Sequence, residues 1–194
     1  MTSMLQKFSL AVAGSVVTVG LLGSSAMAAG FSGEYAPSEW TLTNTNTNGF
    51  VNTSGVPGSI SLTGGNNGGS GFGQTAYTTA AKASGLVSFN WDYTTNDVDG
   101  SSFDPFGYIL NGTFTQLTSN GLKTPQTGNF SFAVLQGDTF GFAVNTTDNI
   151  LGAANVVISN FAAPVPEPAT VAGLLAIGAL GAGAIKRKRQ TTNG

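Results

Sequence analysis

Aspartates are the main candidates for chemistry in this sequence, because four of them fall within one short stretch. This stretch, residues 92–108, reads DYTTNDVDGSSFDPFGY. Asp97 and Asp99 stand two positions apart in front of Gly100, and a glycine permits a sharp turn. Such a turn can bring several oxygen ligands to a hard cation. We therefore expect a calcium site built from Asp97, Asp99 and Asp104.

Two other interpretations of these aspartates stay open. In a solvated acidic loop, Asp and Asn side chains cap turns and bind no metal. In a glycoside hydrolase, two carboxylates face each other across a cleft, and a sequence alone does not show which side chains face each other. The stretch is not an EF-hand, because the further ligand positions and the terminal Glu are missing.

The sequence contains no His and no Cys, which narrows the chemistry further. Without His, Ser-His-Asp catalysis and the common zinc sites are excluded. Without Cys, disulfides and thiolate metal ligands are excluded, so packing must stabilise the domain. We expect no cofactor besides this calcium, and a protein that is not an enzyme. A secreted carbohydrate-active enzyme that uses a carboxylate pair is the alternative.

Residues 29–164 are acidic, because only Lys82 and Lys123 oppose eight Asp and Glu side chains in this segment. Binding to the phosphates of a nucleic acid requires a basic patch, which the segment lacks. We therefore exclude nucleic acid as a partner.

The elements that must position the aspartates are short β-strands. In LVSFNWDY, residues 86–93, large side chains alternate with polar ones, which is the period of a half-buried strand. This alternation places Trp91 in the core. NVVISNF, residues 155–161, is typical of a more fully buried strand. Similar alternation occurs at Phe130/Phe132/Val134, Phe140/Phe142/Val144, Ile60/Leu62 and Trp40/Leu42.

Turn signals separate these strands. Asn111-Gly112 predicts a type I′ hairpin, and LQGD at 135–138 predicts a turn that joins the two Phe-rich strands. The glycine-rich stretch 63–75 predicts a surface loop or linker. Eight to ten short strands favour an all-β fold, an antiparallel β-sandwich or jelly-roll in one domain, with a small barrel as the alternative.

The N-terminus has the pattern of a signal peptide. Lys7 precedes an apolar segment at 8–22, and Ala26-Met27-Ala28 supplies small residues at the two positions that signal peptidase reads. We expect cleavage after Ala28, so that residues 1–28 are not part of the mature domain, which spans 29–164. An uncleaved N-terminal anchor is the alternative.

The C-terminus carries three features in a fixed order. Pro166-Glu167-Pro168 comes first. Its two prolines keep the chain extended and out of the following helix. Residues 169–185 then lack any charge, and as a helix of roughly 26 Å they can just cross a bilayer. Four basic residues follow, and such a flank stays in the cytoplasm together with the end of the chain at 190–194. These residues are Lys186, Arg187, Lys188 and Arg189.

Tripeptide, apolar helix and basic tail together resemble the PEP-CTERM sorting signal, over residues 165–189. The resemblance implies that an exosortase recognises Pro166-Glu167-Pro168, removes the helix, and releases or transfers the protein. It also implies a setting of exopolysaccharide production. We therefore expect an exported cell-surface or extracellular-matrix protein, membrane-anchored before processing, that is structural or binds polysaccharide or protein. An ordinary tail anchor is the alternative.

Overall fold

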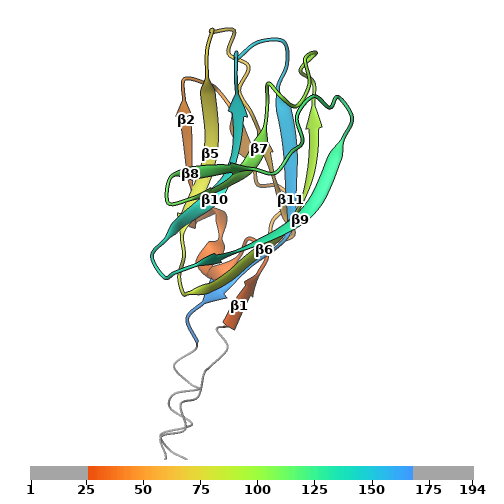
Figure 1. The fold of residues 1–194 in the computed structure, drawn as a ribbon. Coiled ribbons are helices and arrows are strands. Elements are labelled where there is room, and N and C mark those ends of the chain that lie inside the picture. The colour runs from red at the N-terminus through yellow and green to blue at the C-terminus, as the bar shows by residue number, and fades with distance from the viewer. Residues whose placement is uncertain (1–25, 168–194) are drawn as a thin grey trace, which may run out of the picture.

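The computed structural model describes residues 26–167, which form two antiparallel β-sheets packed face to face (Figure 1). This confirms the predicted all-β sandwich. The β11 sheet has the order β3 (Phe50–Asn52), β4 (Ser59–Thr63), β11 (Ala154–Val165), β6 (Gly85–Thr95) and β9 (Gln126–Val134), and β1 (Ala26–Ala29) also pairs with β11. The β10 sheet has the order β2 (Thr41–Thr45), β5 (Gly73–Ala80), β10 (Thr139–Thr146), β7 (Phe106–Leu110) and β8 (Thr113–Gln116).

Helical structure in residues 26–167 is limited to two 3₁₀ turns, η1 (Gly33–Tyr35) and η2 (Pro37–Glu39). Within this described part, neither turn is long or apolar enough to span a membrane. The apolar segment expected to cross the bilayer, 169–185, lies outside the described residues, as do residues 1–25.

The strand predicted from LVSFNWDY is the centre of the fold. It forms β6, and Val87, Phe89, Trp91 and Tyr93 are all buried. The alternation at 130–134, 140–144 and 60–62 is confirmed as β9, β10 and β4, and that at 155–161 lies in β11. Residues of both sheets therefore meet in one core between them.

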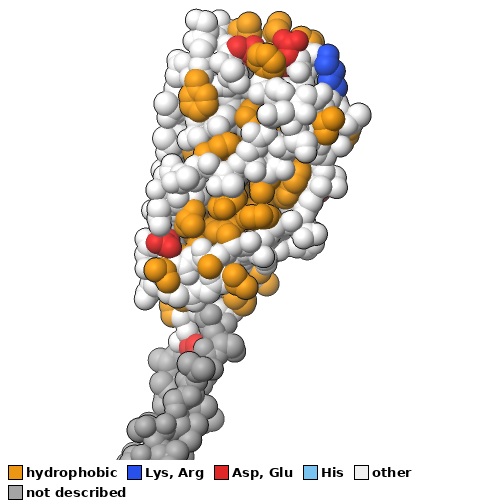
Figure 2. Space-filling model, viewed as in Figure 1, with side chains coloured by type: hydrophobic (Ala, Val, Ile, Leu, Met, Phe, Trp, Pro, Cys, Tyr) orange, Lys and Arg blue, Asp and Glu red, His pale blue; other side chains and the backbone are white. Residues whose placement is uncertain are grey.

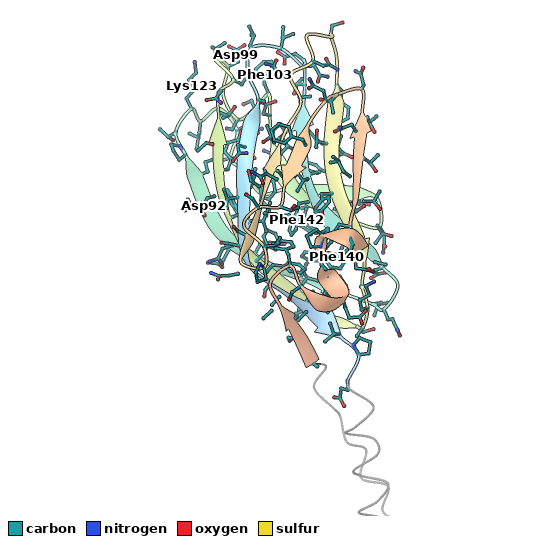
Figure 3. The ribbon with its side chains drawn as sticks, turned by 180° about the vertical axis from the view of Figure 1, so that it is seen from behind. Asp92, Asp99, Phe103, Lys123, Phe140 and Phe142 are labelled. Carbon is teal, nitrogen blue, oxygen red and sulfur yellow. The ribbon has the colours of Figure 1, made fainter. Side chains whose placement is uncertain are left out.

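Aromatic rings dominate this core. Phe140 and Phe142 project from β10 between the sheets (Figure 3). The ring of Phe142 stacks on Trp40 at 5.7 Å between centroids, and Phe31 stacks on Phe161 at 4.7 Å. Buried aromatic pairs add about 0.5–1.5 kcal/mol each beyond their area. Packing thus supplies the stability that disulfides cannot.

Two details of the sequence pattern differ in the structure. Trp40 is buried but ends η2 instead of lying in a strand, and Leu42 in β2 is 41% exposed, because β2 is an edge strand whose inner face is only partly covered. The expected loop at 63–75 is shorter, since Thr63 ends β4 and Gly73–Thr75 begin β5.

The two predicted turns are both present, but one connects strands of the same sheet and the other connects strands of different sheets. Asn111 and Gly112 both have positive φ, 49° and 80°, and connect β7 to β8 as a hairpin. The turn at 135–138 does join the two Phe-rich strands, β9 and β10. These strands belong to different sheets, so the turn carries the chain across the sandwich.

The sandwich has two distinct ends. β1 pairs antiparallel with the last residues of β11, so both ends of the described chain leave at the same end, which we call the terminus end (Figure 1). Asp99, Phe103 and Lys123 lie at the opposite end, the loop end (Figure 3).

Candidate functional site

The sorting tripeptide begins where the sandwich stops. β11 ends at Val165, and Pro166 and Glu167 follow it outside any strand, both exposed. An extended, exposed segment is accessible to a processing enzyme. Pro168 and the basic residues Lys186, Arg187, Lys188 and Arg189 lie outside the described residues.

Two contacts fix the chain just ahead of the tripeptide. The hydroxyl of buried Tyr35 donates to the carbonyl of Pro164 at 2.8 Å, and the Lys82 amide donates to the same hydroxyl at 3.0 Å. Burial raises the pKa of Tyr35, so the hydroxyl stays protonated as this donation requires. Sequence patterns give no signal for Tyr35, because its partner is 129 residues away.

The predicted signal-peptidase site lies in β1. Ala26 pairs with Val165 and Ala28 pairs with Ala163, so the residues expected at the cleavage site are the ones that flank the end of β11. Cleavage after Ala28 would leave Ala29 as the only residue of β1 in the mature chain.

The three predicted calcium ligands separate into a buried pair and an exposed residue. Asp97 is 3% exposed and Asp104 is fully buried, whereas Asp99 is exposed. The backbone amide of Asp99 donates to Oδ1 of Asp97 at 2.6 Å, so Asp99 helps to form the loop through its backbone. In residues 26–167 no three His, Cys, Asp or Glu side chains come together as a metal-binding group.

The hydroxyl of Thr95 connects the buried pair. Oγ1 of Thr95 accepts from the Asp97 amide at 3.0 Å and donates to Oδ2 of Asp104 at 3.4 Å. The pKa of Asp104 is raised to about 7, first by burial and then by the charge of Asp97, while the nearby hydroxyls of Thr146 and Thr95 oppose the rise. Burial is also the main cause that raises the pKa of Asp97.

The outer face of the β10 sheet carries small and polar side chains. Because Phe140, Phe142 and Val144 point into the core, Gly141, Ala143 and Asn145 lie on the opposite side. The register places Gly141 between Thr78 and Ile109, and Ala143 between Ala76 and Gly107. We call Ala76, Gly107, Gly141 and Ala143, with their neighbours, the small-residue face.

Larger groups border this face. Phe114 of β8 packs with the Ala76, Ile109 and Ala143 cluster, and its ring lies over Gly107. Nε2 of Gln74 donates to Oδ1 of Asn145 at 2.8 Å. The small residues of this face alternate with core residues along β5 and β7. The sequence analysis missed the face because small residues do not indicate a strand.

An apolar band lies between the edge strands of the two sheets. Hydrophobic side chains gather across the middle of the molecule in Figure 2, where β8 and β9 flank the sandwich. Tyr108 contacts Phe130 and Phe132 there, with centroids 5.1 and 4.5 Å away. Tyr108 and Phe130 are only partly buried members of the core, so this band is where the core reaches the surface.

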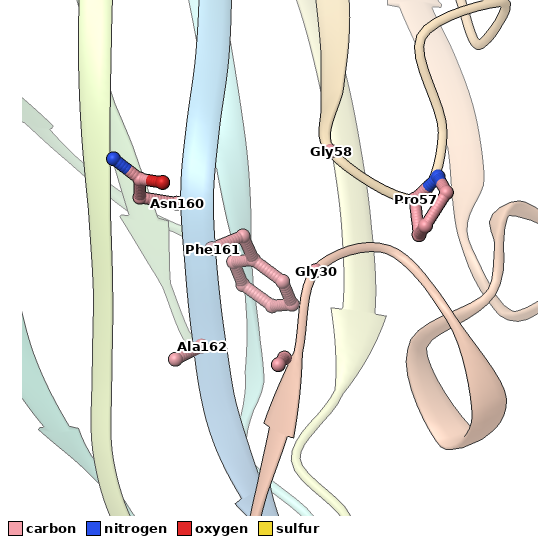
Figure 4. Close-up of a pocket in the computed structure, with 7 residues that line it drawn as sticks. Gly30, Pro57, Gly58, Asn160, Phe161 and Ala162 are labelled. Carbon is pink, nitrogen blue, oxygen red and sulfur yellow. The ribbon is translucent and has the colours of Figure 1, made fainter.

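A pocket of about 410 Å³ lies at the terminus end (Figure 4). It opens beside the irregular pairing of β11 between Ser159 and Ala162. It contains no ionisable side chain, so it offers shape but no acid, base or charged ligand. Its lining consists of Ala29, Gly30, Pro57, Gly58, Asn160, Phe161 and Ala162.

Several solved structures similar to this chain are carbohydrate-binding modules. One is a family 35 module from Clostridium thermocellum, with 14% identity, a TM-score of 0.35, and coverage of 69% of this chain and 98% of that chain. Another is TmCBM27, described for specific mannan recognition, with 12% identity, a TM-score of 0.41, and coverage of 72% and 98%. Likeness this distant carries no argument about function. No curated protein matches the chain.

The C-terminal segment matches a known protein family model. Residues 164–189 match the PEP-CTERM protein-sorting motif, which includes the predicted tripeptide and basic tail. The resemblance seen in the sequence is thereby confirmed. This chain therefore carries a PEP-CTERM sorting signal, which implies that it is exported and sorted at a membrane.

Proposed function

We propose that this protein is a non-catalytic component of the cell surface or extracellular matrix, delivered by its PEP-CTERM signal. The observation that carries the proposal is the position of the signal. It follows directly on β11, with Pro166 and Glu167 exposed, so an enzyme can reach the junction without unfolding the sandwich.

The placement of the two chain ends supports this role. Because β1 and the end of β11 lie side by side, a membrane segment after Glu167 holds the terminus end toward the bilayer. The loop end then points away from the membrane. Signal peptidase and an exosortase are the processing partners, and the protein is membrane-anchored until the second cleavage.

Variants of Glu167 test the processing. In the native host, Glu167→Ala leaves a larger, unprocessed chain in the membrane fraction if an exosortase reads the tripeptide. Glu34→Ala, which changes an exposed Glu of η1, is the matched control and is processed normally. Equal processing of both variants would contradict recognition of the tripeptide.

The ligand that best suits the domain is a neutral polysaccharide. The small-residue face and its borders contain no charged side chain, and they offer hydroxyls and amides that hydrogen-bond to sugars. Phe114 supplies an apolar ring beside them. Polyanionic chains are disfavoured, because residues 29–164 are themselves acidic.

A binding experiment tests this choice. Electrophoresis through gels that contain neutral or acidic polysaccharide from the host shows retardation only by neutral polymer, and Phe114→Ala weakens it at least fivefold. Phe50→Ala changes a 55% exposed Phe on β3 of the other sheet, and it leaves retardation unchanged. Equal loss in both variants, or retardation by the acidic polymer alone, would contradict the proposal.

The burial of the acidic pair supports a non-catalytic role over a carbohydrate-active enzyme. A glycosidase needs two carboxylates that contact substrate across a cleft. Asp97 and Asp104 are buried, and neither lines the pocket at the terminus end or the one beside Ser59 and Val157. We expect no release of reducing sugar from host polysaccharide, and release abolished by Asp104→Asn would overturn this.

A further inference from the structure

We propose that a calcium ion binds between the carboxylates of Asp97 and Asp104 at the loop end. Both side chains are more than nine-tenths buried. Oδ2 of Asp97 and Oδ1 of Asp104 have no hydrogen-bond partner among the described residues. A buried carboxylate oxygen without a partner is costly, and an ion between the two would satisfy both.

Each carboxylate is already held by its other oxygen. Oδ1 of Asp97 accepts from the Asp99 amide, and Oδ2 of Asp104 accepts from Thr95. These bonds fix the orientation of both side chains and leave the second oxygen of each without a donor. Such a preset arrangement lowers the entropy cost of binding an ion.

Neutral oxygens complete the ligand set. Calcium takes six to eight oxygens and accepts carbonyls and water besides carboxylates. The hydroxyls of Thr95 and Thr146 lie beside Asp104. Two carboxylates therefore suffice, although no third acidic side chain joins them in the described part of the chain.

No side-chain cation neutralises the pair within residues 26–167. Lys82 forms an ion pair with Glu39 at 2.8 Å instead. Lys123 lies beside Gly100 at the loop end, yet it forms no ion pair among the described residues. The other charges near the pair, Asp99 and Asp148, are negative and therefore do not neutralise it.

The proposed site differs from the one expected from sequence. Asp99 is exposed and contributes its backbone amide to Asp97, so its carboxylate is not among the ligands. The affinity expected is that of extracellular modules, with a Kd of about 10⁻⁴–10⁻³ M. The inference requires that the chain is exported, but it does not depend on the polysaccharide proposed above.

Direct binding to the full-length chain tests the site. Equilibrium dialysis of the detergent-purified protein against radioactive calcium is expected to give one saturable site per chain. Asp97→Asn and Asp104→Asn each lower the affinity at least tenfold. Asp99→Asn in the same loop and Asp92→Asn, which changes an exposed side chain of β6, are the matched controls, and both stay within twofold of the wild type.

The outcomes separate the proposal from a proton-bearing pair. Absence of saturable binding up to about 10 mM calcium, well above the expected Kd, overturns the site. Equal losses in Asp99→Asn and Asp97→Asn overturn this choice of ligands. If the buried variants do not fold, thermal unfolding of the wild type decides, because calcium must raise the midpoint above that in chelator and equimolar magnesium must raise it less.

Discussion

The terminus end and the loop end of this sandwich are built in opposite ways. At the terminus end, aromatic rings pack together, as in the contacts of Phe161 with Phe31 and Tyr35. At the loop end, polar groups are buried instead, including Asp97, Asp104 and Asn149. The terminus end is thus stabilised mainly by apolar packing, whereas the loop end buries carboxyl groups that need a partner.

Under the two proposals above, the ends have separate tasks. The terminus end must stay folded while enzymes act on its flanking segments, and apolar packing does not depend on any bound ion. In the proposed arrangement the loop end is directed away from the membrane, where calcium is available to an exported protein. The predictions below act on one end at a time, from the largest expected effect to the smallest.

Truncating Phe161 should have the largest effect. This buried ring stacks on Phe31 and also contacts Tyr35, Trp40, Phe140 and Phe142. Phe161→Ala should destabilise the protein by about 3–5 kcal/mol in denaturant unfolding, as expected for a core Phe. Phe103 is partly buried at the loop end, so Phe103→Ala should lower the free energy of unfolding clearly less. An equal loss in both variants would contradict the contrast between the ends.

Removing the Tyr35 hydroxyl should have a smaller effect that is local to the sorting junction. Tyr35→Phe leaves the buried Pro164 carbonyl without its donor, which typically costs about 1–3 kcal/mol. Hydrogen exchange should accelerate at the β11 amides near Val165. Tyr108→Phe is the control, and unchanged exchange in Tyr35→Phe would show that the hydroxyl does not hold the junction.

Removing a hydroxyl beside the acidic pair should affect only the loop end. Thr95→Val keeps the shape but removes the donor to Asp104 and the acceptor of the Asp97 amide. We expect about 1–2 kcal/mol lower unfolding free energy in chelator, with unchanged exchange at the end of β11. Thr94→Val, whose exposed side chain lies beside it on β6, should have little effect.

Signal-peptide cleavage should have the smallest effect on stability and a distinct local signature. If cleavage follows Ala28, the mature chain loses Ala26–Ala28 and Ala163–Val165 lose their partners in β1. Exchange at the Ala163 and Val165 amides should then be faster in the mature protein than in a chain that retains residues 1–28, whereas Pro164 has no amide hydrogen to exchange. Slow exchange in both forms would place the cleavage before β1.

The sequence was a good guide where structure is local. Alternation predicted β6, β9 and β10, Asn111-Gly112 predicted a hairpin, and the order of the C-terminal features predicted the sorting signal. It failed where the contact partner lies far along the chain. Nothing near Tyr35 points to Pro164, and the spacing of Asp97, Asp99 and Asp104 does not reveal which of them the loop buries.

The intact mass of the protein from membrane, surface and medium fractions of its native host tests the central claim most directly. The account predicts a surface or medium product that ends near residues 166–168, with or without added mass. A membrane product that still ends at Gly194, with no shorter form in any fraction, would contradict it and would leave a plain tail anchor.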